Sequence, residues 1–140
     1  MRHMILLMLS SLFAFALMAC GGPSDNDTPI QRSYADFDHI DHWDDLDRLE
    51  GEKSILYYYS PTCHVCIAMK DEVLGLLWDL REDREIYLVN AGFMHEQGTP
   101  PMESEAVPAL IIFHDGVFTE HILGSTPVLD YLDNERDATD

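Results

Sequence analysis

The sequence predicts an α/β fold in which a mixed central sheet of four to five strands carries helices on both faces. Short apolar runs without polar alternation lie on either side of a longer segment with helical periodicity. This order is typical of parallel strands that are buried on both faces and joined by a crossover helix. An Asp-Gly pair then joins two further apolar runs, which indicates an antiparallel hairpin. A parallel unit followed by a hairpin gives a mixed sheet.

The first part of the predicted domain carries an apolar side chain at every third residue: Tyr34, Phe37, Ile40, Trp43, Leu46 and Leu49. An α-helix turns once in about 3.6 residues, so one long helix would rotate this stripe away from the core. We therefore expect a short extended segment over residues 37–40 and a separate helix from a cap at Asp41 to about residue 50. Asp44, three residues after that cap, resembles the second member of a capping box.

Residues 55–59 form a continuous apolar run, which predicts a strand covered on both faces. Ser60, Pro61 and Thr62 end this strand, and a helix is expected over residues 63–80. Its inward face carries Cys66, Met69, Val73, Leu76, Leu77 and Leu80 at helical spacing. Residues 85–90 predict a second strand, and residues 91–107, rich in Gly and Pro, predict a loop.

The C-terminal part predicts a hairpin and a helix. Strands are expected over residues 109–114 and 117–122, with Asp115-Gly116 as the turn between them. A last helix is expected to begin with Thr126 as its cap and Pro127 at its first position, where a missing backbone N–H costs nothing.

The N-terminus has the composition of a secretory signal. Arg2 and His3 precede an apolar stretch over residues 4–18, which is shorter than the roughly 20 residues that span a bilayer. The sequence around Cys20, Leu17-Met18-Ala19-Cys20-Gly21-Gly22, resembles the lipobox of bacterial lipoproteins. This resemblance implies a signal peptide over residues 1–19 and a lipid on Cys20. Residues 20–33 then form a flexible tether and residues 34–140 the domain, while an uncleaved anchor is the alternative.

The chain is strongly acidic. It contains 26 Asp and Glu residues against 8 Lys and Arg residues, for a formal net charge of −18. Such a field repels phosphates, which argues against nucleic acids and anionic lipids as partners. A high-salt habitat, a basic partner and simple solubility all remain open as reasons for the charge.

The motif Cys63-His64-Val65-Cys66 stands where the first strand passes into the first long helix. A sulfur at a helix N-terminus faces unpaired N–H groups and the positive end of the helix dipole, which favour the thiolate. A partly protonated His64 would stabilise the thiolate further and make the disulfide more oxidising, unless it is an ordinary surface histidine. The motif is also half of a zinc site, but zinc would need two more ligands.

Four features together resemble the thioredoxin superfamily over residues 35–135: the strand and motif at residues 57–66, the segment at residues 106–113, the Asp115-Gly116 hairpin, and residues 124–127 at the start of the last helix. The resemblance implies that Cys63 is the exposed nucleophile and Cys66 the buried resolving thiol. It also implies that Pro108 is a cis-proline beside them, and that the backbone of Val107 binds an extended substrate segment.

The sequence departs from thioredoxins proper at three places. His64 and Val65 replace Gly-Pro between the cysteines and are expected to modulate the thiols. Tyr57 stands six residues before Cys63, where thioredoxins have a buried acid, and Asp71 replaces a helix proline. Residues 57–59, three consecutive tyrosines, are otherwise predicted as core.

The sequence thus predicts a membrane-tethered thiol–disulfide oxidoreductase of the bacterial cell envelope, facing the periplasm or extracytoplasmic side. We expect it to be a monomer that needs no metal or organic cofactor and acts on protein thiol and disulfide clients with a separate redox partner. The alternatives are an envelope copper-handling protein that binds Cu(I) through the two thiols, and a non-catalytic thioredoxin-like adaptor with a structural disulfide.

Overall fold

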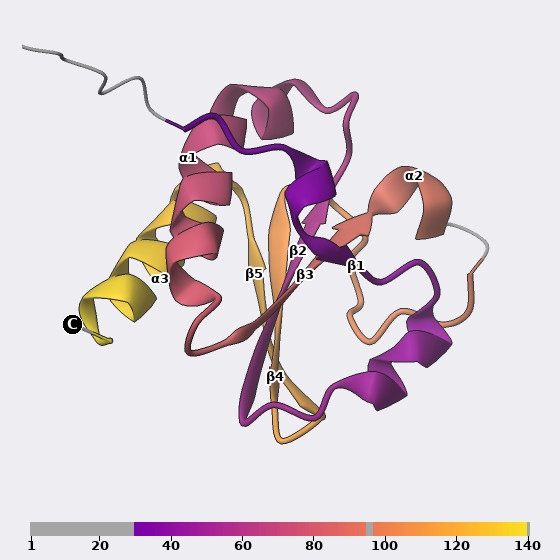
Figure 1. Cartoon of the computed structure of the whole chain (residues 1–140). Helices are drawn as coiled ribbons and strands as arrows, with labels where there is room; N and C mark the ends of the chain where they lie inside the picture. The colour runs from indigo at the N-terminus through magenta and orange to yellow at the C-terminus, as the bar shows by residue number, and fades with distance from the viewer. Residues whose placement is uncertain (1–29, 95–96, 140) are drawn as a thin grey trace, which may run out of the picture. The chain divides into compact units, whose positions relative to one another are not determined.

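The computed structural model describes residues 30–94 and 97–139. Residues 31–139 contain a five-stranded sheet with the strand order β1-β3-β2-β4-β5 (Figure 1). The strands are β1 Asp38–His39, β2 Lys53–Tyr59, β3 Glu85–Asn90, β4 Ala109–His114 and β5 Val117–Leu123. β1, β3 and β2 are parallel, whereas β4 and β5 run antiparallel to their neighbours. The predicted mixed sheet is confirmed.

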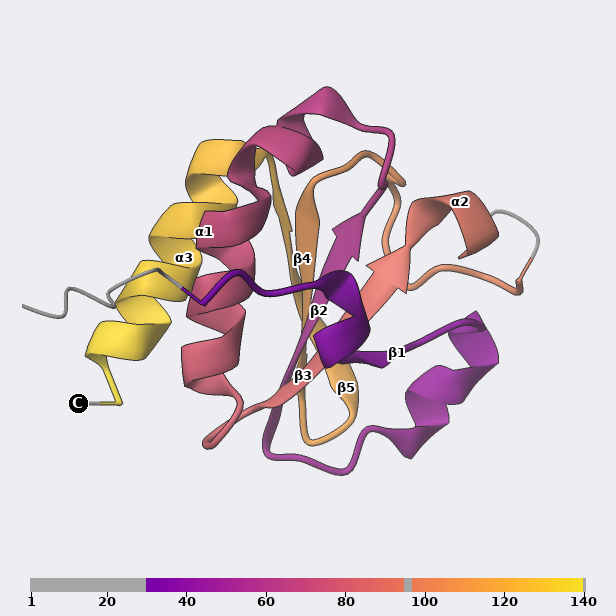
Figure 2. The same cartoon turned by 45° about the horizontal axis from the view of Figure 1, so that its top comes forward.

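Helices lie on both faces of this sheet, as the sequence predicted. α1 (His64–Leu80) and α3 (Ser125–Asp137) pack side by side on one face (Figures 1 and 2). The other face is covered by the 3-10 helix η2 (Trp43–Arg48), the short helix α2 (Ala91–Met94) and the loop that contains Met102. A further 3-10 helix, η1 (Tyr34–Asp36), precedes β1.

β2 is buried on both faces because its side chains alternate between two cores. Ile55, Tyr57 and Tyr59 pack under α1 and α3, in the same cluster as Cys66. Leu56 and Tyr58 point to the opposite face, where they pack with Trp43 and Met94. The unbroken apolar run therefore predicted the placement of this strand correctly.

The predicted α-helix capped by Asp41 is wrong in type and in cap. The segment is the 3-10 helix η2, and its N-cap is His42, whose Nδ1 accepts a hydrogen bond from the Asp44 backbone N–H at 3.2 Å. Asp44 is thus a backbone donor and not a member of a capping box. A 3-10 helix has about three residues per turn, so side chains at every third residue share one face. Trp43 and Leu49 are buried in this way.

The start of the last helix also differs from the prediction. α3 begins at Ser125 after Gly124, which has φ 101° and offers no side-chain cap, so Thr126 is not the cap. Gly124 adopts a backbone conformation that L side chains rarely reach, and its N–H donates to the Pro108 carbonyl at 2.9 Å. Pro127 still lies in the first turn, where its missing N–H leaves no bond unmade.

Two short helices were not expected. The predicted loop over residues 91–107 begins with α2, and η1 is capped by Ser33 through a capping box with Asp36. Arg32, the residue before that cap, stacks on Trp78 with its guanidinium carbon 3.7 Å from the ring centroid. The end of the segment predicted as a tether therefore contacts α1.

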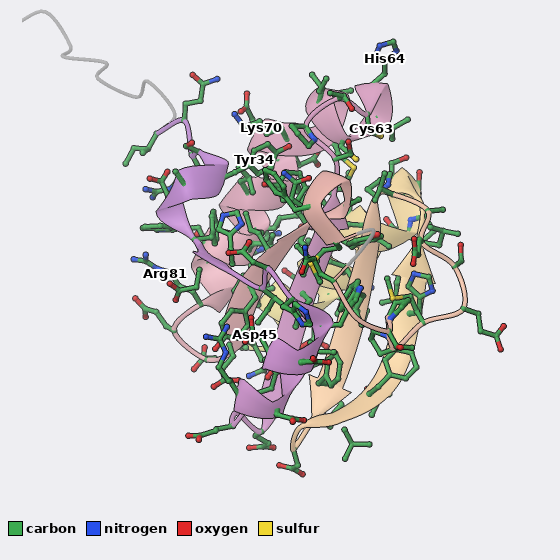
Figure 3. All side chains as sticks on the ribbon, turned by 90° about the vertical axis from the view of Figure 1, so that its right-hand side faces the viewer. Tyr34, Asp45, Cys63, His64, Lys70 and Arg81 are labelled. Carbon is green, nitrogen blue, oxygen red and sulfur yellow. The ribbon has the colours of Figure 1, made fainter. Side chains whose placement is uncertain are left out.

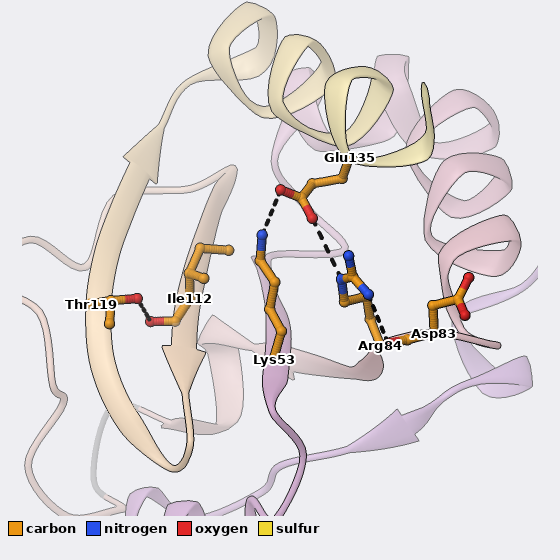
Figure 4. A network of polar contacts seen from close by, with 6 residues as sticks. All are labelled: Lys53, Asp83, Arg84, Ile112, Thr119 and Glu135. Carbon is orange, nitrogen blue, oxygen red and sulfur yellow. Dashed lines mark hydrogen bonds and ion pairs between the residues drawn. The ribbon is translucent and has the colours of Figure 1, made fainter. Parts of the chain in front are cut away.

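A partly buried ion network joins the sheet to the last helix (Figure 4). Glu135 of α3 binds Lys53 of β2 through one carboxylate oxygen, and the Nε of Arg84 lies 3.5 Å from the other. In β5 the register shifts opposite Ile112 and Phe113, and the Thr119 hydroxyl donates to the Ile112 carbonyl at 3.1 Å. These contacts fix the end of the sheet from which β2 begins.

The predicted signal peptide (residues 1–19), Cys20 and the tether as far as residue 29 lie outside the described residues. Within residues 30–94 and 97–139, no helix has both the length and the apolar character that crossing a membrane requires.

Candidate active site

The connection between β2 and α1 places Cys63 at the start of the helix. Two hydrogen bonds close this turn: the Cys63 N–H donates to the Ser60 carbonyl at 3.2 Å, and the Thr62 N–H donates to the Ser60 hydroxyl at 3.3 Å. Cys63 is the N-cap residue, with extended backbone, and its carbonyl accepts the first helical bond from the Ile67 N–H at 3.0 Å. The predicted position of the first thiol is confirmed.

The two sulfurs occupy different surroundings. The Cys63 Sγ accepts a hydrogen bond from the Cys66 backbone N–H, with 3.3 Å between nitrogen and sulfur. Cys63 is partly exposed, whereas Cys66 is fully buried beneath the first turn of α1. Both are free thiols in this structure. One thiol of the pair is thus accessible from outside, and the other is accessible only to its neighbour.

Their proton affinities differ in the same sense. Partial burial raises the pKa of the Cys63 thiol, but hydrogen bonds from the Cys66 thiol and from the backbone N–H groups of Cys66 and Val65 outweigh it, so its pKa lies below the ordinary value. Burial, together with the hydrogen bond that its thiol makes to Cys63, raises the pKa of Cys66 to about 11. The Cys63 thiol therefore ionises more readily than the Cys66 thiol, which keeps its proton to higher pH.

The Val107–Pro108 segment lies beside the dithiol. β4 runs antiparallel to β2 and its first residue, Ala109, pairs with Tyr58, so the residues before Ala109 lie next to the end of β2 where the motif begins. The Val107 carbonyl oxygen is 4.0 Å from the Cys63 Sγ, and the Val107–Pro108 peptide bond is cis. The predicted cis bond and its proximity to Cys63 are confirmed. Binding of a substrate segment at Val107 stays a prediction.

Three tyrosines pack in the same core cluster as the two cysteines. The Tyr34 ring of η1 stacks on Tyr59 at 4.0 Å between centroids, and Tyr59 stacks on Tyr57 at 5.7 Å. Lys70 of α1 lies 5.1 Å from the Tyr34 ring centroid, and Figure 3 shows both side chains on the same side of the molecule as Cys63. The sequence interpretation made Tyr34 part of a core stripe and missed its approach to the cysteines.

No protein family model matches the sequence, and no curated protein matches it. Solved structures do match the fold. Oxidised mitochondrial thioredoxin 3 from Saccharomyces cerevisiae superposes with a TM-score of 0.63 at 18% identity, covering 76% of this chain and 99% of that chain. Fasciola hepatica thioredoxin superposes with a TM-score of 0.58 at 15% identity, covering 71% and 99%. The chain has the thioredoxin fold. The fold that the resemblance read from the sequence implied is confirmed.

On this thioredoxin fold, His64 and Val65 extend outward from the turn that carries Cys63. Figure 3 shows the His64 side chain pointing away from the body of the domain. Among the described residues His64 makes no side-chain hydrogen bond or ion pair, and the Val65 side chain is 47% exposed. Val65 acts on Cys63 through its backbone N–H. The modulating role predicted for His64 stays a prediction.

The part of the thioredoxin fold that the structure describes brings no third metal ligand to the two thiols. Within the part of the chain that the structure describes, no three His, Cys, Asp or Glu side chains are close enough together to hold a metal ion. Cys20 lies outside that part, so its predicted lipidation is not tested. The chemistry available at the described site is that of two thiols with unequal acidity.

Proposed function

We propose that this chain is a thiol–disulfide oxidoreductase that works through a reversible Cys63–Cys66 disulfide. The observation that supports it best is the difference between the two thiols. Cys63 is partly exposed with a lowered pKa, and Cys66 is buried with a raised pKa, three residues away on the same helix turn. A nucleophile that reaches clients and a shielded thiol that follows it are what exchange through a mixed disulfide requires.

In the reducing direction, the Cys63 thiolate attacks one sulfur of a client disulfide. A Cys63–client bond forms, the client S–S bond breaks, and the second client sulfur leaves as a thiolate. Cys66 then loses its proton and attacks the Cys63 sulfur, which releases the first client sulfur and closes the Cys63–Cys66 disulfide. The client gains two electrons, and the protein pair loses two. The oxidising direction is the reverse of this sequence.

Client proteins would approach across the Val107 segment. The Val107 carbonyl lies 4.0 Å from the Cys63 Sγ, so a client backbone that pairs with Val107 would hold its sulfur near the nucleophile. Glu103 and Glu105 precede this segment and are exposed, which favours clients that are not themselves acidic.

We further propose that the protein works as a lipid-anchored monomer on the extracytoplasmic side of the bacterial cell envelope, with a separate redox partner that resets the pair. The support is the lipobox-like sequence at Cys20 and the polar segment that follows it. Mass spectrometry of the purified protein for a diacylglyceryl group on Cys20 tests the anchor, and an unmodified Cys20 would contradict it.

Trapping of mixed disulfides tests the assigned chemistry. In Cys66→Ser the attack of Cys63 survives but resolution is lost, so clients should accumulate on Cys63 and migrate as high-mass adducts on a non-reducing gel. The matched variant Cys63→Ser removes the accessible nucleophile and should trap none. Equal trapping by the two variants would contradict the assignment of roles.

A further inference from the structure

Tyr57 carries a buried hydroxyl group without a partner. Its side chain is fully buried, and among the described residues its hydroxyl has no hydrogen-bond partner at normal distance and angle. A buried hydroxyl left unpaired is unfavourable, so such groups are uncommon and call for an explanation at the place where they occur. The place here is the interior side of the dithiol.

The surroundings of this hydroxyl point to the sulfur of Cys66. Tyr57 lies on the face of β2 that packs under α1, in the same core cluster as Cys66. The two groups are close enough that the phenol favours the ionised form of the Cys66 thiol, while Cys66 in turn disfavours ionisation of the phenol. Tyr59 stacks on Tyr57, and Tyr34 stacks on Tyr59, so aromatic rings keep water from this side of the pair.

We propose that the Tyr57 hydroxyl is the hydrogen-bond donor that stabilises the Cys66 thiolate when Cys66 resolves a mixed disulfide. This inference rests on the proposed function of the Cys63–Cys66 pair. It gives Tyr57 a role beyond core packing, because Tyr57 and the reacting sulfur of Cys66 lie in the same buried cluster.

The chemistry explains why the hydroxyl is unpaired in the dithiol form. A neutral thiol is a weak acceptor, so Tyr57 gains little from it, whereas a thiolate is a strong acceptor in a water-poor site. Burial raises the pKa of Tyr57 far above neutrality, so the phenol stays protonated and serves as a donor, not as a base. The proton that Cys66 releases is matched by the proton that the client thiolate, set free in the first step, takes up. The Cys66 thiolate then forms the bond to Cys63 as the remaining client sulfur leaves with the bonding electron pair.

Tyr57→Phe removes the hydroxyl and keeps the ring, and Tyr58→Phe is the matched control. Tyr58 is the next residue of β2 and equally buried, but it faces the opposite core. The probe is 5,5′-dithiobis(2-nitrobenzoate) added to the reduced full-length chain in detergent. It releases one nitrothiobenzoate as the Cys63 thiolate attacks its disulfide and a second as Cys66 resolves the adduct. The second release is followed by absorbance from pH 6 to 9.

We expect Tyr57→Phe to slow the second release roughly tenfold, with a pH profile displaced by about one unit to higher pH, because one hydrogen bond to a charged group is lost. The first release should be unchanged, and the melting temperature should not fall, since an unpaired buried hydroxyl is removed. Tyr58→Phe should match the wild type. A Tyr57→Phe profile that coincides with the wild type, or an equal displacement in Tyr58→Phe, would overturn the inference.

A second readout separates this inference from the proposed function. In a Cys63→Ser background, the pH dependence of the Cys66 Cβ chemical shift reports the ionisation of its thiol whether or not the pair exchanges disulfides, and it needs no reagent that reaches the buried sulfur. Adding Tyr57→Phe should move that titration by about one unit to higher pH. An unchanged titration would refute the role of Tyr57. A wild-type chain that never releases a second nitrothiobenzoate would instead refute the proposed disulfide exchange. The comparison of the two chains in the Cys63→Ser background would then still test the role of Tyr57.

Discussion

Raising the pH should destabilise the reduced wild-type chain more than a Cys66→Ala variant. The pKa of Cys66 rises from 9.0 to about 11 on folding. Between these values the unfolded chain has lost this proton and the folded chain still holds it, so the free energy of unfolding falls as the pH rises. The stabilisation is fully present below pH 9 and is lost as the pH passes through about 11. Two units correspond to about 3 kcal/mol at roughly 1.4 kcal/mol per unit.

Other groups can be separated from this effect. The lowered pKa of Cys63 acts in the opposite direction and at lower pH, since its contribution is present above its unfolded pKa and is lost as the pH falls through the folded value. The raised pKa values of the buried tyrosines come first from burial, which both proteins share, and act above about pH 10. Because the Cys66 thiol also helps to lower the pKa of Cys63, the difference between wild type and Cys66→Ala reports Cys66 together with its effect on Cys63, and above pH 9 the loss of the Cys66 proton dominates that difference.

The assay is urea unfolding of the reduced full-length chain at pH 8 and pH 10.5, in a phosphine reductant that prevents disulfide formation. Cys66→Ala lowers the stability at both pH values through the small cavity that it leaves. The additional loss on raising the pH should be larger in the wild type by about 2 kcal/mol over this range. Parallel losses in the two proteins would refute a buried, neutral Cys66.

Three further predictions concern the scaffold. Gly75→Ala in α1 should raise the free energy of unfolding by about 0.5–1 kcal/mol, because nothing lies within 4 Å of the added Cβ. Gly116→Ala should lower the free energy of unfolding by about 1–2 kcal/mol, because φ is +74° and the added Cβ would lie 3.2 Å from the Leu49 carbonyl oxygen. Urea unfolding measures both glycine variants, and shifts of the same sign would contradict the reasoning. Glu135→Gln should cost about 2 kcal/mol in the same assay, because Lys53 and Arg84 lose a shared carboxylate, while disulfide exchange stays unchanged. Altered exchange would show that the ion network reaches the dithiol.

The strands and the first long helix could be predicted because their signals are local. The run at residues 55–59 has no charged side chain and no polar alternation, and β2 is indeed covered on both faces. Asp115 and Gly116 both adopt positive φ, 50° and 74°, which is the backbone that an Asp-Gly hairpin turn requires. The position of Cys63 as the N-cap of α1 followed from the strand, the breaker residues and the helical spacing after them.

The type of the helix near Trp43 could not be predicted because a distant segment holds it. The Trp43 N–H donates to the Gln97 carbonyl at 2.9 Å, a bond that no local window of sequence contains. The spacing of three residues was present in the sequence, but it was interpreted as a reason to split an α-helix and not as the period of a 3-10 helix. Gly124 similarly replaces Thr126 as the cap because its backbone is bound to the Pro108 carbonyl.

At the candidate site, the sequence identified the residues, and the structure shows how the surroundings of these residues differ. Cys63, Cys66, Val107 and Pro108 came from motif spacing and a family resemblance, and the fold brings all four together. The approach of Tyr34 depends on how the chain before β1 packs on α1, for which the sequence offered only an aromatic stripe. The unpaired hydroxyl of Tyr57 is visible only once the buried side of the pair is known.

The reduction potential of the Cys63–Cys66 pair tests the central claim most directly. The full-length chain is equilibrated in glutathione and dithiothreitol buffers of stepped potential, quenched by alkylation and scored by mass. A thiolate-stabilising environment at Cys63 favours the dithiol form, so we predict a reversible two-electron transition well above roughly −300 mV. A pair that remains oxidised below that potential would be a structural disulfide, and a pair that never closes would have no exchange chemistry. Either result would contradict the account.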